Sequence, residues 1–187
     1  MTVSCKIVPY VEYDGMRTYS DTFICELYNR MEKEGTAQVV FSDGEIDNVS
    51  EFLSAMKYGA NALYLVELKN EIAGIIWLNR FKSKTCHVHF CAFQEYWGHG
   101  SVEIGRSAIS QVIHMKNADG GYSLDALLGL IPCNNVQAIK WLKKVGLKEV
   151  GVIPMALWNQ DVGKSEDGLL LCLTREHLKE IGNEDIY

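Results

Sequence analysis

The stretch of sequence that decides the fold runs from Thr85 to Lys116 and has three parts: TCHVHFCAF at 85–93, QEYWGHG at 94–100 and SVEIGRSAISQVIHMK at 101–116. The first part is rich in β-branched, aromatic and small apolar residues, which is typical of a strand. Alternate residues of a strand point to opposite faces, so one face carries Cys86, Val88, Phe90 and Ala92, and the other carries His87, His89, Cys91 and Phe93. Both faces can be buried, and the strand is therefore predicted to lie inside a sheet.

The glycine-containing loop and the helix pattern after it form an arrangement that can bind an anion. Gly98 and Gly100 allow positive φ and a close approach of a ligand to the backbone. A helix that starts near Ser101 points its unpaired N–H groups at the same place. This helix carries small and apolar residues at helical spacing: Val102, Gly105, Ala108, Ile109, Val112 and Ile113. From these residues alone, a phosphate site and a simple tight turn are both open interpretations.

Length and composition limit the classes of protein to which the chain can belong. Its 187 residues are enough for one domain with a sizeable core. The formal net charge of -6 and the scatter of Lys and Arg argue against nucleic acid or an anionic membrane as partner. The six cysteines include no CxxC pair and are expected to be free, mostly buried thiols. No signal-like segment opens the sequence and no apolar run approaches about 18 residues, so we expect a cytoplasmic protein.

The other segments predict alternating strands and helices in a single α/β (α+β) domain over residues 1–187. Expected strands are 3–13, 37–41, 62–68, 71–81, 85–93, 124–131, 150–158 and 168–173, and expected helices are 21–35, 48–59, 101–116, 135–146 and 175–181. The Lys69-Asn70 connection predicts an antiparallel hairpin, which the third strand extends into a meander. The helical crossover after residue 101 predicts that 85–93 and 124–131 are parallel neighbours. The polar segment 159–167 is expected to be a mobile loop.

A second stretch, residues 135–151, resembles a motif of the GNAT superfamily of N-acyltransferases. Many members carry N-x-x-A-I-x-x-Y-x-K-x-G-F in the helix after their fifth strand. The residues that match in register are Asn135, Ala138, Ile139, Lys144 and Gly146. Leu147 replaces the aromatic residue, and Leu142 occupies the position of the tyrosine. The acyl-CoA loop of this family, Q/R-x-x-G-x-G/A, is similar to the loop here, with Glu95 where Gln or Arg is usual.

This resemblance implies a GNAT-like fold, in which a mixed, mostly antiparallel, twisted sheet has helices on both faces. The fourth and fifth main strands, here 86–93 and 124–131, would splay apart. Acetyl-CoA, the implied cosubstrate, would lie between them like an additional strand. The implied cofactor-binding residues are Phe90, Ala92, Gly98, His99, Gly100, Ser101, Asn135 and Ala138. Arg106 is a further candidate for a nucleotide phosphate, with a surface ion pair as the alternative.

The implied reaction is direct attack of an amine on the thioester, which needs a base for the amine and an acid for the thiolate. His89 and Glu103 are the predicted catalytic residues, although a histidine on a central strand can equally be a packed core residue. His87 and His89 have the spacing to chelate zinc, but no third ligand is evident, and we predict no metal.

Leu142 cannot donate a proton to the thiolate where the family often uses its tyrosine. Tyr96, Tyr122, Cys133 or water would have to serve instead. Two functions therefore remain open. One is an acyl-CoA-dependent N-acetyltransferase for an amine of a small molecule or protein, and the other is an inactive GNAT-like binding or structural protein, such as a phage component. Small divergent GNAT-like proteins of phages are similar to this sequence as well, and a homodimer stays open.

Overall fold

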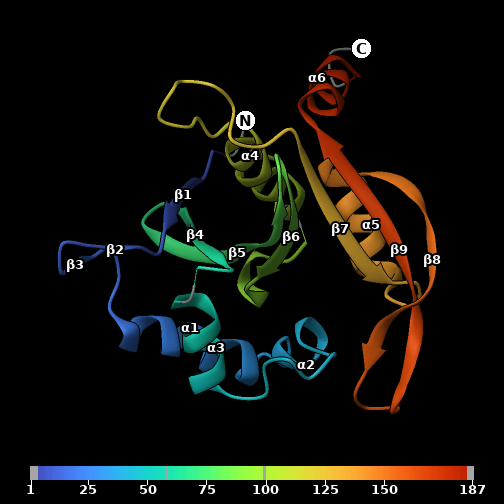
Figure 1. The fold of residues 1–187 in the computed structure, drawn as a ribbon, viewed down its shortest axis with the longest axis horizontal. Coiled ribbons are helices and arrows are strands. Elements are labelled where there is room, and N and C mark those ends of the chain that lie inside the picture. Colours follow the sequence, from blue (N-terminus) through green and yellow to red (C-terminus); the bar gives the residue numbers. More distant parts are fainter. Residues whose placement is uncertain (1–3, 58, 99, 185–187) are drawn as a thin grey trace.

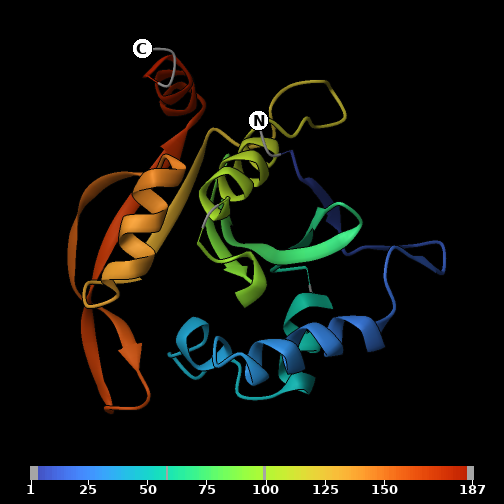
Figure 2. The ribbon, with the colours of Figure 1, turned by 180° about the vertical axis from the view of Figure 1, so that it is seen from behind.

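The computed structural model describes residues 4–57, 59–98 and 100–184 (Figures 1 and 2). Its centre is a seven-stranded sheet with the strand order β1-β4-β5-β6-β7-β9-β8. The strands are β1 (Lys6–Pro9), β4 (Ala62–Leu68), β5 (Glu71–Lys82), β6 (Thr85–Ala92), β7 (Ala126–Pro132), β8 (Lys148–Asn159) and β9 (Lys164–Thr174). Within the described ranges, β6 and β7 are the one parallel pair, and the other neighbours are antiparallel. The prediction of a mixed, mostly antiparallel sheet is confirmed.

The middle of the sheet forms as the sequence indicates. β4, β5 and β6 make the predicted antiparallel meander, and Lys69 and Asn70 turn between the first two strands with φ of 53° and 68°. Helix α4 (Ser101–Ile113) then crosses over so that β7 lies parallel to β6. This crossover places the strand, glycine loop and helix of residues 85–116 at the centre of the molecule (Figure 1).

The N-terminal strand is shorter than predicted, because β1 ends at Pro9. Pro9 still pairs with Tyr64, and the Tyr10 N–H donates to the Leu63 carbonyl at 2.8 Å before the chain leaves the sheet. The chain instead forms a small hairpin of β2 (Glu12–Tyr13) and β3 (Met16–Arg17). Asp14 and Gly15 turn between these strands with φ of 51° and 74°, as a tight hairpin requires.

Three helices cover one face of the sheet: α1 (Asp21–Lys33), α2 (Ala37–Val40) and α3 (Val49–Lys57). The predicted caps of α1 and α3 are confirmed, since the Ser20 and Asn48 side chains accept hydrogen bonds from the N–H groups of residues 23 and 51. The prediction of a strand at 37–41 is wrong. Ala37 and Phe41 are buried against α1 and α3 rather than paired with the sheet, and this packing overrides the strand preference of the two valines between them.

The opposite face is covered by α4 and by α5 (Val136–Val145), which gives helices on both faces as predicted. The predicted stripe of α4 is confirmed, because Gly105, Ala108, Ile109, Val112 and Ile113 are buried in the core with β5, β6 and β7. The C-terminal helix α6 (Arg175–Glu184) follows β9 directly. In the described part of the chain, no helix has the length and apolar character needed to span a membrane.

The two outer strands β8 and β9 extend further than predicted, so the segment 159–167 is mostly strand rather than loop. Their turn reaches the other half of the molecule, where the Gln160 N–H donates to the Ser42 carbonyl at 2.9 Å. Figures 1 and 2 both show this hairpin end beside α2. This turn therefore adds a contact between the N-terminal and C-terminal halves of the chain at a place separate from the β6–β7 pairing.

Candidate functional site

The pairing of β6 with β7 stops early. Only Thr85, Cys86 and His87 of β6 have partners on β7, which are residues 126, 127 and 128. Beyond them the two strands separate, as predicted from the resemblance (Figure 1). We call the unpaired part of these two strands, residues 88–92 of β6 and 129–132 of β7, the splay.

The backbone of β6 turns some of its polar groups toward the splay. The Phe93 N–H donates to the Ala73 carbonyl, so residues 93, 91 and 89 bond toward β5. Because bonding direction alternates along an antiparallel pair, the N–H and C=O groups of Phe90 and Ala92 point away from β5, toward β7. Both are predicted cofactor-binding residues, and both thus offer backbone groups at the unpaired edge.

One of these groups already has a partner, because the Trp97 indole N–H donates to the Ala92 carbonyl at 2.8 Å. The Trp97 side chain is half exposed and stands just before Gly98, whose φ is 84°. Trp97 is not among the site residues predicted from the sequence. The indole therefore satisfies the last carbonyl of β6, that of Ala92, on the edge of the strand that has no partner in β7.

Two glycines of the predicted phosphate-binding loop have positive φ and open space beside them. Gly98 and Gly100 have φ of 84° and 97°, and a Cβ atom built on either would meet no heavy atom within 4 Å. Open space therefore lies beside the backbone at both glycines. Helix α4 begins at Ser101, whose hydroxyl donates to the Gly98 carbonyl at 3.0 Å. His99, also predicted to bind the cofactor, lies outside the described residues.

Asn135 begins α5 as its N-cap, and its side-chain oxygen accepts from the Ala138 N–H at 3.1 Å. The matched motif therefore lies on the helix that follows β7, beside the splay. Leu142 is 8% exposed and packs in the core with α4 and β7. Its side chain is a packing residue here.

An aromatic stack crosses the splay on the face of α4 and α5. The rings of Phe90 on β6 and Trp141 on α5 are 4.8 Å apart and nearly parallel. Gly105 of α4 leaves room for the indole, since a Cβ at residue 105 would lie 2.5 Å from Trp141 Cζ2. This packing fixes α4 and α5 against β6 where the strands separate.

His89 lies on the other face of β6. Its ring stacks on Trp77 at 4.8 Å, and Nε2 donates to Asn79 Oδ1 at 3.0 Å. Burial, with smaller effects of nearby His87 and Arg80, lowers the pKa of His89 from 6.5 to about 4. The imidazole is neutral at neutral pH, and Nδ1 carries the lone pair.

The structure does not bring the two predicted catalytic residues together. His89 faces α1 and α2, whereas Glu103 is exposed in the first turn of α4 on the opposite face of the sheet. The two groups cannot act on one proton. Burial also lowers the pKa of His87, with a smaller effect of Arg80.

Three of the other predicted donors and ligands, Tyr96, Tyr122 and Arg106, have structural partners. The Tyr96 hydroxyl donates to Glu71 at 3.0 Å, and burial together with this bond raises its pKa to about 12. Tyr122 lies between Lys116 and the Arg175 guanidinium, remote from the splay on the loop after α4. Arg106 donates from Nε to the Lys144 carbonyl at 2.8 Å, at the end of α5.

The cysteines are less buried than expected. Cys133, at the end of β7, is an exposed thiol, and Cys25 and Cys172 are partly exposed, contrary to the expectation of mostly buried cysteines.

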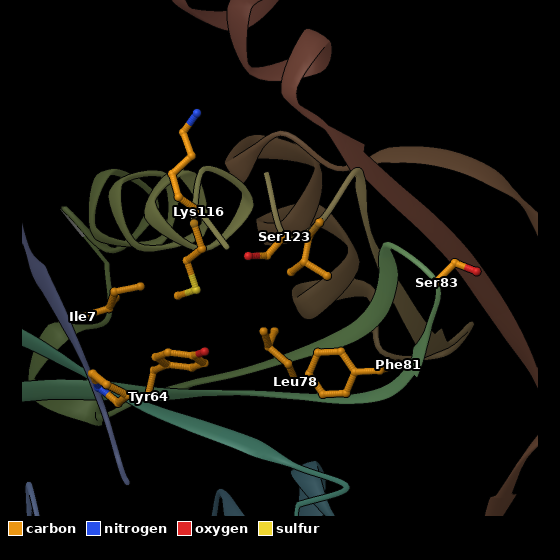
Figure 3. Close-up of a pocket in the computed structure, with 10 residues that line it drawn as sticks. Ile7, Tyr64, Leu78, Phe81, Ser83, Lys116 and Ser123 are labelled. Atoms are coloured by element: carbon orange, nitrogen blue, oxygen red, sulfur yellow. The ribbon is translucent and has the colours of Figure 1, made fainter. Parts of the chain in front are cut away.

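The surface also has a hollow of about 540 Å³ away from these residues (Figure 3). It lies between β1, β4, β5 and the loop after α4, with Tyr64 and Ser123 pointing into it. None of the predicted site residues lines it. Among the described residues, no group of three or more His, Cys, Asp or Glu side chains could hold a metal ion.

Comparison with solved structures assigns the architecture to a class: the chain has the GNAT fold, as the resemblance implied. No protein-family model and no curated protein matches the sequence. One similar structure is the acetyltransferase that modifies the N-terminal serine of ribosomal protein L7/L12 from Salmonella typhimurium. It has a TM-score of 0.69 and 13% identity over 91% of this chain and 95% of that chain.

Two further similar structures contain ligands. Spermidine N-acetyltransferase from Vibrio cholerae, solved with CoA and spermine, has a TM-score of 0.63 and 14% identity over 94% of this chain and 98% of its own. The microcin C7 self-immunity acetyltransferase MccE, solved with acetyl-CoA and AMP, has a TM-score of 0.62 and 16% identity, and the match covers 83% of this chain and 88% of its own. These structural neighbours are N-acetyltransferases that bind acetyl-CoA or CoA.

Proposed function

We propose that this protein is an acyl-CoA-dependent N-acyltransferase that transfers acetyl from acetyl-CoA to a primary amine by direct attack. The observation that carries the proposal is the coincidence of the splay with the open glycine loop at the end of the same strand. A strand edge with unpaired backbone groups, next to a helix N-terminus, suits an extended ligand that ends in phosphates. The GNAT fold of the chain supports the same ligand.

The residues beside the splay fit acetyl-CoA, which supplies an acetyl group already activated as a thioester. Backbone amides of the loop at Gly98, Gly100 and Ser101 would hold the pyrophosphate. Backbone groups of Phe90 and Ala92 would bind the pantetheine arm, after Trp97 releases the Ala92 carbonyl. Asn135, the N-cap of α5, and Ala138 in the first turn of this helix follow β7 and would contact the same arm.

For the acceptor amine, His89 is the proposed base. It lies on β6 two residues after His87, the last residue paired with β7, and Asn79 holds its tautomer so that Nδ1 can accept a proton. Its pKa of about 4 makes it a weak base, and Glu103 on the other face is the second candidate. We propose a cytoplasmic protein with a small-molecule or protein amine as acceptor, and neither nucleic acid nor a membrane as partner.

An inactive GNAT-like protein that binds acyl-CoA, or serves a structural role, is the second candidate. Leu142 favours it, because this buried leucine stands where the family motif has a proton-donating tyrosine. The low basicity of His89 favours it as well. In the binding form of this alternative the splay holds acyl-CoA, but the acetyl group is not transferred to an acceptor.

Two measurements test the proposal. Acetyl-CoA at a hundred times its dissociation constant should stabilise the protein by about 2.7 kcal/mol, and no shift in the melting temperature would contradict both roles. Thiol release from acetyl-CoA should then be followed with a panel of amines, peptides and cell extract, for wild type, His89→Gln and Glu103→Gln. Loss of a real base costs about 10² to 10⁴ in rate. Binding without transfer to any acceptor would favour the inactive alternative.

A further inference from the structure

The end of β6 and the start of the glycine loop are tied to α1 by one partly exposed cluster of charges. Arg30 of α1 donates from Nε to Glu34 and from a terminal nitrogen to Glu95, each at 2.8 Å. Its guanidinium also lies 3.8 Å from the centre of the Phe93 ring, which is fully buried. Arg30 thus joins one residue of its own helix to two residues at the start of the loop.

Glu34 binds Gln94, the residue between Phe93 and Glu95. One carboxylate oxygen of Glu34 accepts from the Gln94 N–H at 2.9 Å, and the Glu34 carbonyl accepts from the Gln94 side chain at 2.8 Å. The Glu34 side chain is only 13% exposed. Phe93, Gln94 and Glu95 are therefore each bound to the end of α1 that follows Arg30.

We propose that Arg30 and Glu34 are positioning residues, which hold the loop of residues 94–100 in the conformation that receives the phosphates of acyl-CoA. The inference rests on the proposed function. Glu95 occupies the position where the related loop motif has Gln or Arg, and here it turns away from the loop to Arg30 on α1. The carboxylate at this position therefore has a structural partner and need not face the ligand.

The physical reason is preorganisation. Gly98 and Gly100 have positive φ, and glycine also allows many other conformations, so the contacts at the ends of the loop add to its own hydrogen bonds in limiting these conformations. One end is α4, and the other is the segment 93–95 fastened to α1. A loop ordered before binding spares the ligand the entropy of ordering it, and affinity rises accordingly. An ion pair exposed on its own would do little, but a network with two carboxylates and an aromatic ring has defined geometry.

Arg17 provides a matched control. It also pairs with two carboxylates, Glu12 at 2.6 Å and Asp21 at 2.9 Å, and its side chain is 37% exposed against 31% for Arg30. This second cluster ties the β2–β3 hairpin to the start of α1, at the opposite end of the helix from Arg30. Removing it perturbs α1 to a similar degree without touching the loop.

The test uses three loop-side variants: Glu95→Gln, Arg30→Met and the double variant that carries both changes. The two control variants are Glu12→Gln and Arg17→Met. Arg30→Met keeps an apolar side chain over the Phe93 ring and loses the charge and the hydrogen bonds to Glu34 and Glu95. Calorimetry would give the dissociation constant of acetyl-CoA, and thermal melts would give stability. We expect each loop-side variant to weaken binding about 3- to 10-fold and the double variant to be no weaker than the poorer single variant. The two control variants should change the constant less than about 2-fold.

The outcomes separate the positioning role from general stability. A coupled loss of affinity in the Arg30 and Glu95 variants, with unchanged affinity in equally destabilised control variants, supports the proposal. Wild-type affinity in the loop-side variants, or an equal loss in the controls, overturns it. If wild type itself binds no acetyl-CoA, the proposed function fails first and the positioning role falls with it.

Discussion

Acidification should destabilise this protein mainly through His89, a half-buried histidine. Burial lowers the pKa of His89 from 6.5 to about 4, and its neighbours His87 and Arg80 act in the same direction. Between these two values the unfolded chain binds a proton at this residue and the folded chain does not. The free energy of unfolding therefore falls as the pH drops from 6.5 to 4, and this term stays constant above pH 6.5.

The magnitude follows from the two pKa values. At 1.36 kcal/mol per pH unit, the loss from His89 amounts to about 2.5 kcal/mol by pH 4.5 and about 3 kcal/mol by pH 4. Acid protonates the carboxylates of wild type and of a His89→Gln variant alike. The prediction therefore concerns the difference in the free energy of unfolding between these two proteins. That difference in free energy of unfolding should shift by about 2.5 kcal/mol in favour of the variant between pH 7 and pH 4.5.

Urea unfolding followed by circular dichroism at pH 7, 5.5 and 4.5 measures this difference. His87→Gln serves as a comparison, since the pKa of His87 is lowered in the same direction in a less buried place, and its effect should be smaller. A difference between wild type and His89→Gln that stays the same at all three pH values would refute the reasoning. It would mean that water reaches the imidazole despite its stacking on Trp77.

Three further predictions concern the binding of acetyl-CoA. Gly100→Val should abolish binding, because a side chain would occupy the open space beside the loop at a φ of 97°; tight binding of this variant in calorimetry would move the phosphate site elsewhere. Asn135→Asp should keep the cap on the Ala138 N–H, and so the melting temperature, but weaken binding through loss of the amide donor and added negative charge; unchanged affinity would leave Asn135 a cap only. Trp97→Phe should tighten binding up to about 10-fold by freeing the Ala92 carbonyl, since a hydrogen bond contributes about 0.5–1.5 kcal/mol, and weaker binding would show that the indole contacts the ligand instead.

Patterns within one element were sufficient to predict most of the fold. The alternation in residues 85–93 assigned His89 and Phe90 to opposite faces, and the structure places the first against Trp77 and the second against Trp141. The caps at Ser20 and Asn48 could be predicted for the same reason, since a cap depends only on its next three residues. Local chemistry decides such features.

Features that depend on distant contacts could not be read in this way. The segment 37–41 has strand-forming valines, but it becomes a helix because its ends pack on α1 and α3. Arg30 and Glu95 are 65 residues apart, and no local pattern pairs them. The hairpin at Asp14-Gly15 is different, because this dipeptide is a recognised turn signal. It directly follows the strand predicted at 3–13, and a hairpin could have been predicted from it.

The short ladder between β6 and β7 has a consequence for how the molecule unfolds. Three residue pairs are the whole sheet connection between the four strands β1, β4, β5 and β6 and the three strands β7, β9 and β8. Each group has its own extensive pairing, and beyond these pairs the two groups are joined mainly by the apolar core that they share with α4, so we expect each to open as a separate cooperative unit. A ligand bound along both edges of the splay would join the two units and make them exchange their amide hydrogens together. Hydrogen exchange of β9 would then be slowed by a ligand whose phosphates are proposed to bind at the N-terminus of α4, on the other side of the splay.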